Sequence, residues 1–279
     1  MSSMRETQAI TNLAAHGYLT QRHVDELVLG GSTLSPQSRQ VVVRRVLGRL
    51  KRLGLILETP RVMSPGWQAT RLVYFLTAAG YREAQRLNPE LPARRPHHGD
   101  ASLMAHALMC ADVAVAFRQA ARNRPGDELV DWESGWLAAE RLGSTVVVPD
   151  ARVVYATGEW EIDAFIEVDL ATEGSRVFAA KVAQYLDLYR SGEWRGHLPV
   201  WPIVLTITPS AARNATLRRV AATVMSAQSD AERIRTAFEF AFCPINDMTG
   251  PAGPLGAIWT FAGRSGKEMI LGTLNRGSG

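Results

Sequence analysis

Residues 149–170 read PDARVVYATGEWEIDAFIEVDL, and this stretch decides the fold of the larger part of the chain. Two apolar, β-rich runs flank a turn around Gly158, which predicts a hairpin of two adjacent antiparallel strands. The second run contains Glu167 and Asp169, whose side chains point from the same face because strand side chains alternate. Two neighbouring carboxylates on a core strand are costly unless something compensates their charge.

A third acid, Asp150, suggests that the pair belongs to a metal site. Asp150 stands in the preceding strand, and facing side chains of adjacent antiparallel strands lie about 5 Å apart. We therefore expect Asp150, Glu167 and Asp169 to converge and to hold Mg²⁺ or Mn²⁺, because hard cations prefer carboxylate oxygens. Such a site suits phosphodiester hydrolysis. The alternative is a structural ion pair of Glu167 with Arg152 or Arg176.

The segment after the hairpin adds polar groups to the same site. Residues 175–190 are predicted to form a helix on which Lys181, Gln184 and Tyr185 share one face. Lys181 could orient the attacking group or stabilise charge on the phosphate, and Gln184 and Tyr185 could contact a DNA strand. The expected catalytic residues are Asp150, Glu167, Asp169, Lys181 and Gln184. Asp112 and Glu133 both remain candidates for a further acid.

Around this hairpin the periodicity predicts a mixed sheet flanked by helices, an architecture between α+β and α/β. A long amphipathic helix spans residues 101–122, and short strands are expected at 129–133, 145–155, 161–170 and 201–208. A further helix covers 210–225, and edge strands are expected at 237–242 and 257–261.

The first third of the chain has a different pattern. Helical spacing predicts helices at 5–16, 21–29 and 36–53, followed by a hairpin of strands 55–58 and 71–76 and a helix at 78–87. Three short helices followed by a hairpin is the order of a winged helix-turn-helix, whose third helix lies in the major groove of DNA.

The third helix is basic throughout. It contains six Lys or Arg and no acidic residue in 18 positions, which favours DNA contact over an ordinary solvated face. Two further arginines flank the tip of the hairpin. The expected DNA-binding residues are Arg39, Arg44, Arg45, Arg49, Lys51, Arg52, Arg61 and Arg71.

The distribution of charge and the position of a proline-rich segment divide the chain at the same place. Residues 1–99 hold 14 Lys or Arg against 6 Asp or Glu, whereas residues 100–279 hold 17 against 21. We expect a DNA-binding domain at 1–87, a proline-rich linker at 88–100 and a second domain at 101–279. The sequence shows no secretory signal and no apolar run of about 20 residues, so we expect a cytoplasmic protein without a membrane span.

Two resemblances sharpen these expectations. Pro149-Asp150 followed by Glu167-x-Asp169 resembles the PD-(D/E)xK nuclease superfamily, which implies a restriction-endonuclease-like domain. Where that pattern has a lysine this chain has Asp169, and Lys181 on the following helix would take its place.

Residues 5–225 resemble the replication-relaxation family of plasmids, conjugative elements and phages. The segments that carry this resemblance are Pro149-Asp150-Ala151, Glu167–Glu173, Lys181, Tyr185 or Tyr189, and residues 208–213.

These resemblances imply a role in processing plasmid or mobile-element DNA, and two functions fit. One is a metal-dependent DNA endonuclease of plasmid replication or mobilisation. The other is a winged-helix replication accessory or regulator whose nuclease-like domain is inactive. The expected partners are double-stranded DNA, a second copy of the chain and plasmid replication or mobilisation proteins.

Overall fold

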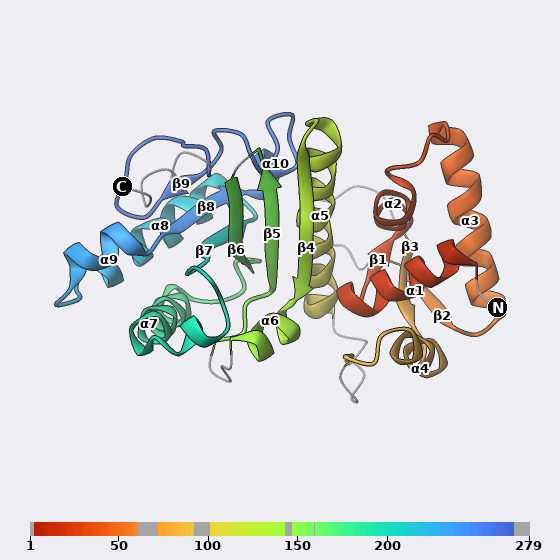
Figure 1. Ribbon diagram of the computed structural model, residues 1–279, viewed down its shortest axis with the longest axis horizontal. Coiled ribbons are helices and arrows are strands. Elements are labelled where there is room, and N and C mark those ends of the chain that lie inside the picture. Colours follow the sequence, from red (N-terminus) through yellow and green to blue (C-terminus); the bar gives the residue numbers. More distant parts are fainter. Residues whose placement is uncertain (1–2, 61–71, 92–100, 143–146, 159, 271–279) are drawn as a thin grey trace. The chain divides into compact units, whose positions relative to one another are not determined.

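The computed structural model describes residues 3–60, 72–91, 101–142, 147–158 and 160–270 (Figure 1). The chain forms two compact units, Met1–Val115 and Ala116–Gly279, so helix α5 (Ala101–Asn123) begins in the first and ends in the second. The sequence predicted the boundary at 88–100, of which 92–100 lies outside the described residues. The first half of α5 belongs with the first unit because Met104 and Leu108 share a buried cluster with Tyr18 and Val73.

The first unit consists of short helices and a small antiparallel sheet of order β1-β3-β2. Its elements are α1 (Met4–His16), β1 (Leu19–Thr20), α2 (Gln21–Val24), a π-helical turn (Asp25–Leu29), α3 (Pro36–Arg52), β2 (Ile56–Pro60), β3 (Leu72–Leu76) and α4 (Ala78–Leu87). The predicted order of helices and hairpin is confirmed. The predicted single helix at 21–29 is wrong in detail, because its second half winds as a π-helix.

The starts of these helices follow from local chemistry. The Ser35 hydroxyl accepts a hydrogen bond from the Ser38 main-chain N–H, and Pro36 occupies the first turn of α3, where a missing N–H costs nothing. Thr77 caps α4 in the same way, by accepting from Gly80. Both helices begin where the sequence predicted, at Pro36 and Ala78.

The second unit is built on a six-stranded mixed sheet of order β4-β5-β6-β7-β8-β9 (Figure 1). Strands β4 to β6 are antiparallel, β6, β7 and β8 are parallel, and β9 runs antiparallel to β8. The strands are β4 (Asp127–Ser134), β5 (Ala151–Thr157), β6 (Trp160–Val168), β7 (Ile203–Thr208), β8 (Phe240–Pro244) and β9 (Thr260–Phe261). The helices are α6 (Gly135–Arg141), α7 (Ser175–Ser191), a 3-10 turn (Glu193–Gly196), α8 (Ala211–Ser226), α9 (Ala231–Ala237) and α10 (Ile245–Met248).

Helices cover both faces of this sheet. Val182 and Tyr185 of α7 and Leu217 of α8 share a buried cluster with Phe165 on one face. On the other face, the Phe117 ring at the end of α5 lies against Trp132 and Tyr155. The predicted mixed sheet with flanking helices is confirmed.

Two strand boundaries differ from the prediction. Strand β5 begins at Ala151 rather than within 145–149, since Pro149 has no N–H to donate to a ladder. Helix α9 continues to Ala237, so strand β8 begins only at Phe240.

By length and composition alone, helix α5 is long and apolar enough to cross a membrane. Since 56% of its most apolar part is buried inside the structure, the helix also fits the description of a core helix.

Candidate functional site

Asp150 is fixed at the start of β5, opposite Glu167. Its main-chain N–H donates to the Ile166 carbonyl at 2.9 Å, and its Oδ2 accepts from the Val168 N–H at 2.7 Å. Gly135 makes this position possible, since a Cβ there would collide with the Pro149 carbonyl oxygen. The hairpin register, with Ala151 opposite Ile166, therefore brings Asp150 and Glu167 together as predicted.

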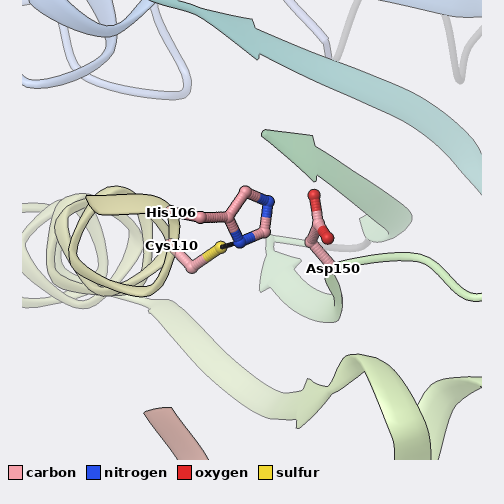
Figure 2. Close-up of side chains that lie close together, drawn as sticks. All are labelled: His106, Cys110 and Asp150. Carbon is pink, nitrogen blue, oxygen red and sulfur yellow. Dashed lines mark hydrogen bonds between the residues drawn. The ribbon is translucent and has the colours of Figure 1, made fainter. Parts of the chain in front are cut away.

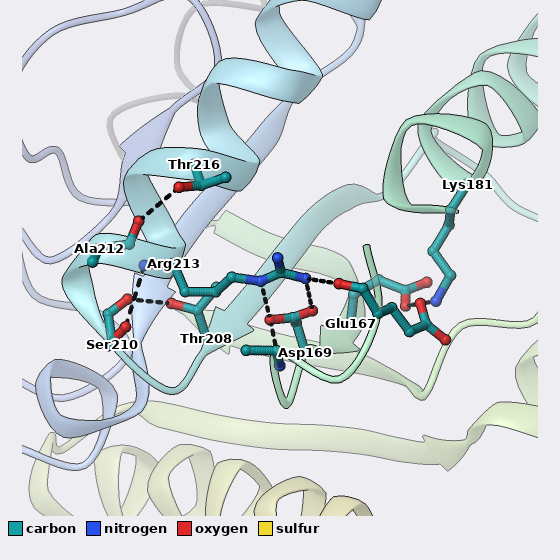
Figure 3. A network of polar contacts seen from close by, with 10 residues as sticks. Glu167, Asp169, Lys181, Thr208, Ser210, Ala212, Arg213 and Thr216 are labelled. Atoms are coloured by element: carbon teal, nitrogen blue, oxygen red, sulfur yellow. Dashed lines mark hydrogen bonds and ion pairs between the residues drawn. The ribbon is translucent and has the colours of Figure 1, made fainter. Parts of the chain in front are cut away.

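Glu167 is the most constrained acid of the site. Its side chain is buried, and its Oε2 lies 2.5 Å from Lys181 Nζ (Figure 3). Its Oε1 accepts from the Tyr185 hydroxyl at 2.5 Å. Burial, followed by repulsion from Asp150, raises the pKa of Glu167 to about 7, although Lys181 and Tyr185 act against this rise. The carboxyl group therefore exchanges a proton near neutral pH.

The two partners of Glu167 come from one helix, as their spacing predicted. Burial disfavours the charged form of Lys181, but attraction to Glu167 and Asp150 outweighs it and raises the Lys181 pKa. Burial and the adjacent Glu167 charge also raise the Tyr185 pKa well above its ordinary value. The prediction that Tyr185 contacts DNA is wrong, because its ring is fully buried. Gln184 is exposed on the same helix.

Asp169 is bound by Arg213, a residue that was not among the predicted site residues. Arg213 of α8 donates to its two oxygens at 2.7 and 2.8 Å and to the Glu173 carbonyl at 2.7 Å (Figure 3). The Ala171 N–H also donates to Asp169, and Ala171 has a φ of 59°, a strained value for a residue with a side chain. The loop between β6 and α7 is thus tied to the start of α8.

Among the described residues, Glu167 pairs with neither Arg152 nor Arg176, the two partners of the structural alternative; its cationic partner is Lys181. Arg152 does not neutralise Glu167; it pairs with Asp163 at 2.5 Å and with Glu133 at 3.3 Å. Burial raises the Asp163 pKa, opposed by Arg152. Because Glu133 forms an ion pair with Arg152, it is not available as a third acid beside Asp150 and Glu167.

The other candidate acid, Asp112, belongs to the first unit. Its Oδ1 lies 3.0 Å from His23 Nε2 and 3.3 Å from Arg22. Elsewhere on α5, the Cys110 sulfur and His106 Nδ1 are 3.8 Å apart, one helical turn from each other (Figure 2).

The basic residues of α3 fall into two groups. Arg39 pairs with Asp25 at 3.0 Å and Glu26 at 3.1 Å, Arg49 pairs with Glu6, and Lys51 pairs with Glu58. A second group is exposed and forms no ion pair among the residues that the structure describes. This group consists of Arg44, Arg45 and Arg52. Arg61 and Arg71 lie outside the described residues.

Comparison with known proteins gives one family. Residues 10–204, well over half of the chain, match the family model described as replication-relaxation. A search of curated proteins found no match.

One similar solved structure is the crystal structure of Bacillus subtilis PadR in complex with operator DNA. It is 20% identical over 40% of this chain and 66% of that chain, with a TM-score of 0.23. A likeness this low carries no argument about fold or function.

Proposed function

Because the chain belongs to the replication-relaxation family, we propose that it acts in the replication or mobilisation of a plasmid or other mobile element. In this proposal the first unit binds duplex DNA as a winged helix. The second unit carries a metal-dependent, nuclease-like site for phosphodiester hydrolysis. The observation that carries the proposal is the convergence of Asp150, Glu167 and Lys181 at the start of β5, the end of β6 and one face of α7.

DNA binding rests on the charge of α3. Arg44, Arg45 and Arg52 are exposed and pair with no acid in the part of the chain that the structure describes, which leaves them available to phosphates. Arg39 has a different role, because its guanidinium is held by Asp25 and Glu26 and fixes α3 to the preceding turn. Arg49 and Lys51 would have to leave Glu6 and Glu58 to reach DNA.

The donor set for Mg²⁺ or Mn²⁺ is two carboxylates, Asp150 and Glu167. They fit a hard cation because they are oxygen donors whose mutual repulsion helps to raise the Glu167 pKa, and a bound cation would relieve that repulsion. Asp169 was expected to be the third ligand, but it could join them only by releasing Arg213. We therefore assign Asp169 to the support of the loop.

The protein groups around the cation would each have a definite task. Mg²⁺ or Mn²⁺ would supply positive charge to the phosphate and lower the pKa of a bound water. Tyr185 fixes the Glu167 carboxylate by donating to Oε1. Lys181, whose pKa is raised, keeps a full positive charge beside Glu167 and can stabilise charge on a phosphate oxygen. Gln184, exposed on the same helix, is available to the DNA strand.

One observation favours a second function. Both Glu167 oxygens already accept a hydrogen bond and the residue is only 3% exposed, so a metal would compete with Lys181 and Tyr185 for these oxygens. A chain in which no metal binds there would be a DNA-binding replication accessory or regulator. Paired half-sites would then suit a homodimer, as in other helix-turn-helix proteins.

Supercoiled plasmid tests the proposal. The full chain is incubated with plasmid in Mg²⁺, Mn²⁺ or EDTA, beside Asp150→Asn, Glu167→Gln and the exposed α7 control Asp187→Asn. We expect metal-dependent nicking by the wild type and by the control, and none by the other two variants. Retarded plasmid migration that persists in EDTA, without nicking in any metal, would support the regulator instead.

A further inference from the structure

Helix α3 has an unusual solvent face. At about 100° per residue, Val41 and Gly48 lie near its midline, opposite the buried Val46 and Leu50. Arg44, Arg45 and Arg52 lie within about 60° of Gly48. An ordinary solvated helix face carries polar side chains throughout, whereas here an exposed valine and a glycine lie among the arginines.

Among the described residues, no contact requires a glycine at position 48. A Cβ built there meets no described atom within 4 Å, so alanine would fit. Glycine inside a helix costs up to about 1 kcal/mol relative to alanine. Glycine also allows another molecule to approach the helix backbone closely, and the open space around Gly48 is consistent with that use.

The exposure of Val41 is also better explained by contact with a partner than by packing in the core. This residue is 49% exposed in a helix whose neighbouring Val43 is buried. An apolar side chain at the centre of a basic face has a natural counterpart in DNA, because the thymine methyl group is the apolar feature of the major groove. Charge complementarity with Arg44, Arg45 and Arg52 selects the same partner.

We propose that Val41 and Gly48 form the base-reading line of α3. Val41 contacts a thymine methyl group, Gly48 lets the helix backbone approach the base edges, and the flanking arginines contact phosphates. This inference rests on the proposed binding of duplex DNA and adds which residues read the sequence.

Gly48→Ala in the full chain tests the close approach. Since alanine is the better helix former and has room, the variant should melt about 2–4 °C higher than the wild type. Its Kd for a random-sequence duplex pool, measured by fluorescence anisotropy, should rise at least about tenfold. Binding by the stabilised variant that equals or exceeds wild-type binding would overturn the role of Gly48.

Thymine-to-uracil exchange tests Val41. Duplexes selected from the random pool by the wild type should show a thymine-enriched position. Uracil at that position removes one methyl group and should weaken wild-type binding about fourfold, but should leave Val41→Ala binding unchanged. No thymine enrichment, or an equal loss in Val41→Ala, would overturn the assignment.

Arg44→Ala and Arg45→Ala separate this inference from DNA binding itself. If both variants bind weakly while Gly48→Ala and Val41→Ala bind as the wild type does, DNA binding stands and the base-reading line is wrong. If the wild type binds no duplex at all, the proposed DNA-binding function fails first.

Discussion

Arg213 and Asp169 form a bidentate ion pair that joins the loop after β6 to the start of α8. Both oxygens of Asp169 lie within 2.8 Å of the guanidinium nitrogens. The two residues are 44 positions apart, and both side chains are largely buried. Paired guanidinium and carboxylate groups of this geometry are the stronger class of charged hydrogen bond. The pair therefore holds the strained loop at Ala171 in one conformation.

Loss of the guanidinium should destabilise the second unit. Arg213→Ala leaves the Asp169 carboxylate largely buried without its main partner, which we expect to cost about 1–3 kcal/mol of unfolding free energy. Arg213→Lys, the matched control, keeps the charge and should cost less. Urea unfolding measures both, and a wild-type midpoint for Arg213→Ala would show that the pair adds nothing.

Glu167 should make stability depend on pH. Its pKa rises on folding from 4.5 to about 7, so between these values the folded chain holds a proton that the unfolded chain has lost. The unfolding free energy must then fall as pH rises from about 4.5 to 7, by about 3 kcal/mol at most. Urea unfolding in EDTA at several pH values should show a smaller fall for Glu167→Gln. An unchanged slope in that variant would contradict the shifted pKa.

Arg39 and Arg45 should behave differently although both lie on α3. Arg39→Ala removes the partner of Asp25 and Glu26 and should lower stability by about 1–2 kcal/mol. Arg45→Ala should change stability by less than about 0.5 kcal/mol but weaken DNA binding and lower the salt slope by about one. Anisotropy titrations over a salt series, with parallel unfolding curves, distinguish the two residues. Equal salt slopes for Arg45→Ala and the wild type would remove Arg45 from the phosphate contacts.

Gly135 should control the position of Asp150. Gly135→Ala places a Cβ against the Pro149 carbonyl, and relief of that clash should cost about 1–3 kcal/mol and displace the start of β5. Gly196→Ala is the control, because a Cβ there meets nothing within 4 Å. Unfolding midpoints that fall equally in both variants would mean that the close approach is unimportant.

Local patterns predicted those features that depend on residues close in sequence. The hairpin at 149–170 has its turn at Gly158, and alternation along β6 placed Glu167 opposite Asp150. The spacing of Lys181 and Tyr185 by one helical turn placed both beside Glu167.

The features that the sequence could not reveal depend on distant segments. Residues 208–213 carry part of the family resemblance, but only the parallel packing of β7 next to β6 shows that Arg213, at the start of α8, reaches Asp169. Asp163 looked like an ordinary strand residue until Arg152 and Glu133 were found beside it. Gly135 matters because the backbone of Pro149, 14 residues later and just before β5, passes close to it. None of these pairings leaves a periodic signal.

Mn²⁺ binding tests the central claim, that Asp150 and Glu167 hold a divalent cation. Electron paramagnetic resonance of free Mn²⁺, titrated into the full chain at pH 8, measures bound metal without any DNA or activity. The wild type and Asp169→Asn should bind Mn²⁺, while Asp150→Asn and Glu167→Gln should lose that binding. Equal binding by Glu167→Gln and the wild type, or no binding by the wild type, would contradict the metal site.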